Sequence, residues 1–85
     1  MFEIVFTTKA RKAYERLSKR AVRLVDRALA SVERDPYAGP QIKRLHGTLD
    51  GLLRIRAGEY RILYEIQDSK RVVAVLVIGT RGNVY

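Results

Sequence analysis

Hydrophobic and polar positions near the start of the chain predict a strand followed by a helix. Phe2 to Phe6 is rich in aromatic and β-branched residues, a composition typical of a buried strand. Thr7 and Thr8 follow, and either hydroxyl can cap a helix that begins near Lys9. The apolar residues of this helix recur at helical spacing on one face: Ala10, Ala13, Tyr14 and Leu17.

A second helix is predicted from about Lys19 to Arg34, with Ser18 as its cap. Asp35-Pro36 ends it, because the residue before a proline disfavours helical backbone angles. Its apolar stripe is Val22, Val25, Ala28, Leu29 and Val32. The outer face of the two-helix hairpin carries basic residues that we interpret mainly as a solvated surface: Lys9, Arg11, Lys12, Arg16, Lys19, Arg20, Arg23 and Arg27.

The second half of the chain has the pattern of a β-meander. Residues 36–47 lack a clean period and begin with two prolines and a glycine, so we interpret them as a connecting loop. Three strand-like runs follow: Leu52 to Ala57, Tyr60 to Gln67 and Arg71 to Gly79. Val72 to Ile78 is apolar at every position, which indicates a central strand covered on both faces or nearly so.

This order of elements predicts an α+β fold. An N-terminal strand and a two-helix hairpin precede a three-stranded antiparallel meander, and the helices pack on one face of a four-stranded sheet. Because 85 residues suffice for about one modest core, residues 1–85 are expected to form a single domain.

The turn at Gly58-Glu59 decides which side chains share a face of the sheet. A glycine in the first loop position favours a type II′ turn, which pairs Arg56 with Arg61 and places Arg54 beside them. The alternating residues then point under the helices: Leu53, Ile55, Ile62 and Tyr64.

Like charges directly opposite each other destabilise a strand pair by up to about 1 kcal/mol, so folding alone gives no reason for this arrangement. A bound phosphate gives one, because guanidinium groups match its geometry. The alternative is that the arginines solubilise the sheet or form surface ion pairs with Glu59 and Glu65. Charge alone does not decide between the two.

The composition points to polyanionic partners. Lysine and arginine number 17 against 9 acidic residues, which gives a net charge of +8 and an isoelectric point near 10.3. Nucleic acid is the first candidate, the ribosome is a special case of it, and an acidic protein segment is the third. A membrane surface ranks lower, because no segment combines a basic face with exposed apolar anchors.

Several classes of protein are not expected. The absence of cysteine excludes disulfides and cysteine-based zinc sites, and one histidine, His46, does not assemble another metal site, so no metal or cofactor is expected. His46 itself is interpreted as a turn or surface residue. The chain start lacks a secretion signal, and Val72 to Gly79 is too short to cross a bilayer as a helix, so a cytoplasmic protein is expected.

Three stretches carry a resemblance to a known family: Lys43 to Gly47, Leu52 to Ile66 and Val77 to Tyr85. In order and spacing they resemble the RelE/ParE toxin superfamily, and within it the RelE-type branch that cleaves messenger RNA. The resemblance spans essentially the whole chain. It implies a sheet with two helices, a basic concave face, a cognate antitoxin that wraps and silences the toxin, and messenger RNA cleavage in the ribosomal decoding site.

The resemblance also implies the site residues. Arg54 and Arg56 match two basic residues of a strand, Arg61 matches an arginine after a tyrosine, Arg81 matches the arginine after the last strand, and Tyr85 matches an aromatic residue near the C-terminus. The resulting assignment makes Arg56, Arg61, Arg81 and Tyr85 catalytic. Arg54, Lys43 and Arg44 are assigned to RNA or phosphate binding.

Metal-independent RNA cleavage uses the ribose 2′-hydroxyl as nucleophile and needs a proton acceptor, charge stabilisation and a proton donor. Arginine, with a pKa above about 12, supplies the charge stabilisation but is a poor base. Some RelE-type enzymes carry lysine where this chain has Arg54 and Arg56, so the proton acceptor stays open. Tyr85 could stack on a base or assist proton transfer. The alternative functions are a ParE-type inhibitor of DNA gyrase and an inactive basic binding module.

Overall fold

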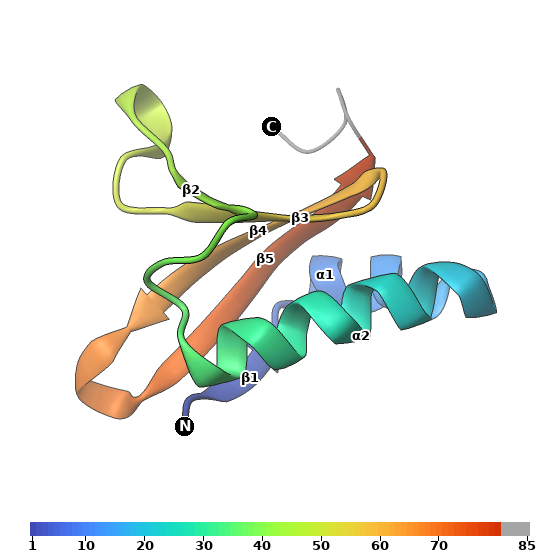
Figure 1. Ribbon diagram of the computed structural model, residues 1–85, viewed down its shortest axis with the longest axis horizontal. Coiled ribbons are helices and arrows are strands. Elements are labelled where there is room, and N and C mark those ends of the chain that lie inside the picture. Colours follow the sequence, from blue (N-terminus) through green and yellow to red (C-terminus); the bar gives the residue numbers. More distant parts are fainter. Residues whose placement is uncertain (81–85) are drawn as a thin grey trace.

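The computed structural model describes residues 1–80 as two layers, a sheet with both helices on one of its faces (Figure 1). The elements are β1 (Glu3–Phe6), α1 (Thr8–Glu15), α2 (Lys19–Arg34), β2 (Ile42–Arg44), β3 (Leu53–Ala57), β4 (Tyr60–Gln67) and β5 (Val72–Thr80). Two short 3₁₀ helices, η1 (Gly47–Leu49) and η2 (Asp68–Lys70), lie in the connections. The predicted α+β class and the packing of both helices on one face are confirmed.

Both helices begin at the predicted caps. The Thr7 hydroxyl accepts a hydrogen bond from the Ala10 amide at 3.1 Å, and the Ser18 hydroxyl accepts one from Ala21 at 3.1 Å. Helix α2 has the predicted bounds, and Asp35 leaves the helix with extended backbone angles. Its buried stripe is Ala21, Val25, Ala28, Leu29 and Val32, so Ala21 takes the place that we predicted for the half-buried Val22.

The sheet has five strands, in the order β1-β5-β4-β3-β2. The prediction of four strands was wrong because residues 42–44, assigned to a loop, form the edge strand β2 against β3. Two backbone bonds flank this pairing, from the Arg56 amide to the Gln41 carbonyl and from the Leu45 amide to the Leu52 carbonyl, both 3.0 Å. A three-residue strand is too short to show a period, so only its partner reveals it.

The core lies between the helices and the sheet. Its fully buried side chains include Val25 and Val32 from α2, Ile62 and Tyr64 from β4, and Val73 and Val75 from β5. The Tyr64 hydroxyl donates a hydrogen bond of 2.7 Å to the Pro36 carbonyl, which fixes the chain leaving α2 onto the sheet.

Strand β5 is central, as predicted, with β1 parallel on one side and β4 antiparallel on the other. Three successive residues, Val73 to Val75, are buried, so both faces of the strand are covered there. Leu76 and Val77 are only partly buried, and coverage is thus incomplete toward the end of the strand. No helix within residues 1–80 is long and apolar enough to cross a membrane.

Candidate active site

The β3–β4 hairpin has the predicted register. Ala57 pairs with Tyr60, Arg56 with Arg61, and Arg54 with Leu63. Gly58 has a φ of 64°, whereas Arg71 is the only non-glycine residue with positive φ among the described residues. A positive φ confined to the first loop position is what a type II′ turn requires.

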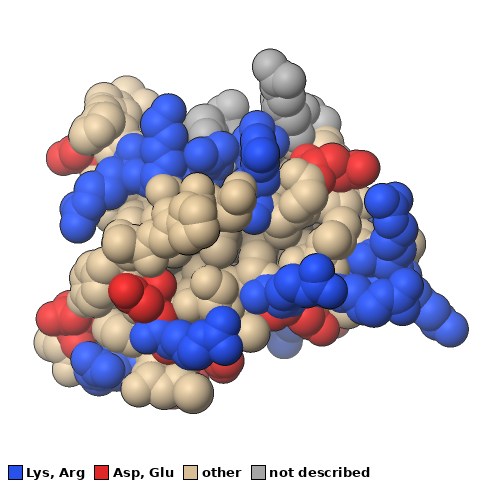
Figure 2. Space-filling model, viewed as in Figure 1, with Lys and Arg blue, Asp and Glu red and all other residues tan. Residues whose placement is uncertain are grey.

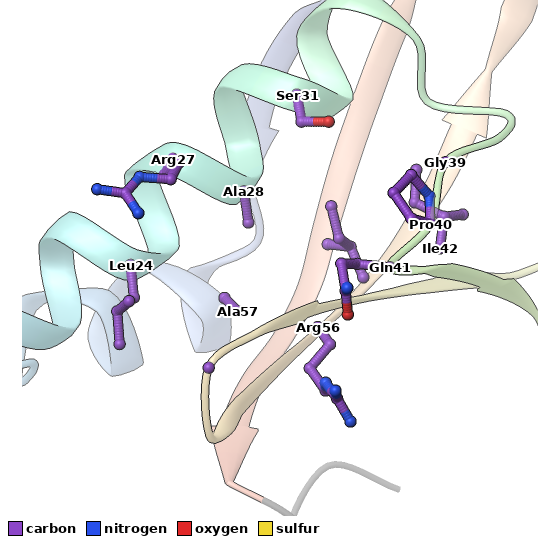
Figure 3. Close-up of a pocket in the computed structure, with 12 residues that line it drawn as sticks. Leu24, Arg27, Ala28, Ser31, Gly39, Pro40, Gln41, Ile42, Arg56 and Ala57 are labelled. Atoms are coloured by element: carbon purple, nitrogen blue, oxygen red, sulfur yellow. The ribbon is translucent and has the colours of Figure 1, made fainter.

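The two faces of the hairpin have opposite characters. Leu53, Ile55, Ile62 and Tyr64 are at most 4% exposed and pack in the core beneath the helices. The alternating residues Arg54, Arg56 and Arg61 therefore lie on the other face. Figure 3 shows the Arg56 side chain pointing away from α2. The prediction that these three arginines share the uncovered face is confirmed.

Strand β2 adds a fourth cation. Lys43 pairs with Arg54 across the β2–β3 ladder, so both side chains lie on the uncovered face. We call these four residues the arginine face: Lys43, Arg54, Arg56 and Arg61. Directly opposite residues have Cβ atoms about 4.5–5.5 Å apart, which brings the Arg56 and Arg61 side chains within reach of one ligand.

The cations of the arginine face are not neutralised within residues 1–80. Neither Glu59 nor Glu65 forms an ion pair with them, and Glu65 instead accepts a 3.4 Å hydrogen bond from the side-chain amide of Gln67. The Nε of Arg54 is buried and has no hydrogen-bond partner. Leaving such a donor unsatisfied costs about 1–3 kcal/mol, so folding does not account for this arrangement.

A buried leucine lies beneath the arginine face. Leu63 lies opposite Arg54 on one side and Val77 on the other, and it is only 4% exposed. Strand β4 thus places Arg61 and Leu63 in succession on this side of the sheet. Because Leu63 is buried, the surface offered to a ligand is that of the cations, which suit the anionic phosphate of a nucleotide.

Comparison with known proteins decides the family. Residues 4–85 match the family described as "ParE toxin of type II toxin-antitoxin system, parDE". The chain belongs to this family, within the RelE/ParE superfamily. The protein is a toxin of a type II toxin–antitoxin system.

Relatives of the toxin agree with this assignment. Toxin RelG of Mycobacterium tuberculosis (strain ATCC 25618 / H37Rv) is 31% identical over 86 residues, which cover 99% of this chain and 95% of that protein. The toxin–antitoxin complex RelBE2 from the same species contains a chain that is 32% identical, with a TM-score of 0.81 and coverage of 94% and 98%. A chain of the archaeal RelE–RelB complex from Pyrococcus horikoshii OT3 is 26% identical, with a TM-score of 0.79 and coverage of 98% of both chains.

The remaining predicted site residues of the toxin do not all join the arginine face. Arg44 pairs with Leu53, so it lies on the opposite side of β2 from Lys43. It lines a separate cleft with His46 and Asp50. Arg81 and Tyr85 lie outside the described residues, and their roles stay predictions.

His46 is exposed and precedes η1, as expected of a turn or surface histidine. Among residues 1–80 the toxin has no group of three or more histidine, aspartate and glutamate side chains that could hold a metal ion. The sequence analysis did not name Leu63 as the buried residue beneath the arginine face, although its position two residues after Arg61 places it on that side of the sheet.

Proposed function

We propose that the toxin is an endoribonuclease of the cytoplasm that cleaves messenger RNA on the ribosome without a metal ion. One observation carries this proposal: Arg56 stands opposite Arg61 on the uncovered sheet face, with Arg54 and Lys43 alongside. No carboxylate within the described chain neutralises them. A phosphodiester would supply the missing negative charge.

The proposed reaction is an internal transesterification. The ribose 2′-oxygen attacks phosphorus and the bond to the 5′-oxygen breaks, which leaves a 2′,3′-cyclic phosphate and a 5′-hydroxyl. One proton leaves the 2′-hydroxyl and one is taken up by the departing oxygen. Arg56 and Arg61 stabilise the charge that develops on the phosphate oxygens, and Arg54 with Lys43 orients the backbone.

Two predicted residues would act on the leaving group and the base. Arg81 is assigned to the departing oxygen, and Tyr85 to stacking or proton transfer. The face is rich in charge stabilisation, but an arginine, with a pKa above about 12, does not serve as a base. We therefore expect cleavage to depend on the ribosome, which would hold the 2′-hydroxyl in line with the leaving oxygen.

A cognate antitoxin is proposed as the second partner. Chains similar to the toxin are seen in the toxin–antitoxin complex RelBE2 and in the archaeal RelE–RelB complex. A net charge of +8 would attract an acidic protein segment, and such a segment over the arginine face would exclude RNA. We expect a gene beside that of the toxin to encode this short acidic protein.

The nuclease proposal is tested by mapping RNA 5′ ends. Purified toxin is incubated with a messenger RNA, with and without 70S ribosomes, and we expect cleavage at fixed positions within codons only when ribosomes are present. Arg61→Ala and Arg81→Ala should abolish cleavage and still bind the antitoxin. Lys70→Ala, an exposed change in η2, serves as the matched control and should cleave normally. Messenger RNA that stays intact on ribosomes, with a wild-type toxin preparation that still inhibits growth on induction, would refute the proposal.

An inhibitor of DNA gyrase is the second candidate, because the description of the matched family names ParE toxins. Such a toxin binds a protein and does not require the arginine face. A supercoiling assay with purified gyrase separates the two candidates. We expect the toxin to leave supercoiling unchanged, and inhibition that survives Arg61→Ala would favour the gyrase function.

A further inference from the structure

Most of the net positive charge lies on the helices, away from the arginine face. Residues 8–34 contain nine lysines and arginines and three acidic residues, a surplus of six within a net charge of +8. All nine basic residues are exposed. Figure 2 shows basic groups over the β2–β3 end of the sheet and others along the helical layer, with mostly uncharged surface and some acidic side chains between them. The protein therefore carries a second cationic surface.

The arginines of α2 form a continuous stripe. Arg20, Arg23, Arg27 and Arg34 are spaced by three, four and seven residues, which keeps them within about 60° of the helix circumference over about 21 Å. We call these four residues the α2 arginine stripe. The buried residues of α2, among them Val25 and Val32, lie on the other side of the helix. The stripe thus faces solvent along most of α2.

The helix does not neutralise this stripe. Arg20 and Arg27 have no carboxylate three or four residues away, where an ion pair would form. Asp26 lies three residues after Arg23, at ion-pairing distance along the helix, but the hydrogen bond that it accepts comes from the Tyr14 hydroxyl, at 2.7 Å. Like charges at these spacings destabilise a helix, and a surface that serves only solubility mixes both signs. An anionic ligand would account for the unbalanced charge.

We propose that the α2 arginine stripe binds the phosphate backbone of structured RNA. The inference deepens the proposed function: the stripe anchors the toxin to ribosomal RNA while the arginine face acts on the messenger. Guanidinium groups bind phosphates through paired hydrogen bonds, and a straight row of them follows a backbone. The helices cover one face of the sheet and the arginine face is the other (Figure 1). The two surfaces approach each other at one pocket, which Arg27 and Arg56 both line, and elsewhere they point in different directions, so we expect them to contact different RNA segments.

RNA fits the stripe better than a protein or a membrane does. Among the described residues the exposed large hydrophobic side chains are Met1, Val5 and Tyr37, and none of them is on α2. The buried centre of a protein interface needs such anchors, and so does a helix that lies in a membrane surface. Phosphate contacts need only cations.

The test compares two sets of charge removals of equal size. The stripe variant is Arg20→Gln/Arg23→Gln/Arg27→Gln, and the control is Lys9→Gln/Arg11→Gln/Lys12→Gln on α1. Binding is measured to a fluorescein-labelled RNA stem-loop of about 20 base pairs, long enough to run beside the whole stripe, and to 70S ribosomes. We expect the stripe variant to bind both at least about tenfold more weakly, with a salt slope reduced by about two to three, and the control to change by less than about threefold.

Three results would overturn the inference. The first is that both variants bind the stem-loop and the ribosome equally weakly, and the second is that the stripe variant binds them as well as the wild type does. The third is that the wild-type protein binds neither the stem-loop nor the ribosome. Polyglutamate that displaces the stem-loop as well as unlabelled RNA does would also refute it and indicate an acidic protein partner. Circular dichroism checks folding, and Arg20→Gln/Arg23→Gln against Lys9→Gln/Arg11→Gln repeats the comparison if a triple variant does not fold.

The outcome is separable from that of the nuclease proposal. Arg61→Ala should lose cleavage and keep its affinity for the stem-loop and the ribosome. If wild-type toxin binds RNA through the stripe and cleaves no messenger RNA, the RNA-binding role of the stripe is supported and the nuclease proposal is refuted. If cleavage occurs and the stripe variant still binds RNA normally, the nuclease proposal is supported and the RNA-binding role of the stripe is refuted.

Discussion

Arg56 stands directly opposite Arg61 across the β3–β4 hairpin, on the face of the sheet that the helices leave uncovered. Two guanidinium groups in this position repel each other in the free protein. In the nuclease function that we propose, they converge on one phosphate of the RNA. On this proposal the pair costs some folding stability and contributes to RNA binding. Neither Glu59 nor Glu65 offsets it within residues 1–80.

This relationship predicts that stability and toxicity change in opposite directions. Arg61→Gln removes the repulsion and should raise the free energy of unfolding by about 0.2–1 kcal/mol, while growth inhibition on induction is lost. Arg61→Glu creates an attractive pair with Arg56, so it should be at least as stable as Arg61→Gln and equally non-toxic. Urea denaturation and a growth assay measure the two effects. A variant that loses both stability and toxicity would contradict the prediction.

The buried hydroxyl of Tyr64 predicts that Tyr64→Phe lowers the stability of the fold. This hydroxyl donates to the Pro36 carbonyl at 2.7 Å, and the side chain is fully buried. Its removal leaves the carbonyl without its partner and should lower the free energy of unfolding by about 1–3 kcal/mol. Urea denaturation at neutral pH measures this. A loss below a few tenths of a kcal/mol would mean that water replaces the hydroxyl.

Tyr64 also predicts how stability depends on pH. Burial raises the pKa of Tyr64 well above its ordinary value of 10.0, and Asp35 raises it further. Above pH 10 the unfolded chain loses this proton and the folded chain keeps it, so stability falls as pH rises, by up to about 1.4 kcal/mol per pH unit. Urea denaturation between pH 9 and 11 should show a shallower decline in Tyr64→Phe than in wild type. Parallel declines would contradict this assignment.

Two glycines with positive φ, Gly58 in the hairpin turn and Gly51 in the loop before β3, predict different costs of substitution by alanine. Gly58 has a φ of 64°, and an added Cβ would lie 3.0 Å from the Leu24 Cδ1 atom. Gly51 has a φ of 92°, with nothing within 4 Å of an added Cβ. Gly58→Ala combines backbone strain with that contact and should cost about 1–3 kcal/mol, more than Gly51→Ala, which has strain alone. Thermal denaturation compares them, and equal costs would mean that Leu24 moves aside.

The backbone conformation of Arg71 predicts that glycine is better tolerated than alanine at this position. Its guanidinium carbon lies 4.3 Å from the centre of the Phe2 ring, and its φ is 55°, in the left-handed region. Arg71→Ala loses the cation–π contact and keeps the strain, at a cost of about 0.5–1 kcal/mol. Arg71→Gly loses the same contact and relieves the strain, so it should be more stable than Arg71→Ala by about 0.5–1 kcal/mol. Chemical denaturation of the two variants gives the difference directly.

Local chemistry explains why much of this fold is predictable from sequence. Helix α2 starts directly after Ser18, whose hydroxyl accepts a hydrogen bond from the Ala21 amide, and it ends at Arg34, two residues before Pro36. The two-residue loop Gly58-Glu59 and the alternation of the flanking strands fit one register, which pairs Arg56 with Arg61. These signals lie within a few residues of their effects, and the arginine face was predictable for that reason.

Contacts between distant segments were not predictable in the same way. Sequence alone determined the two helices, the β3–β4 hairpin and the clustering of Arg54, Arg56 and Arg61. Only the tertiary structure decided that residues 42–44 form an edge strand, which places Lys43 on the arginine face and Arg44 on the other side. The physical reason is range: caps and tight turns are closed by near neighbours, whereas a three-residue strand exists through the hydrogen bonds of a partner strand about ten residues away.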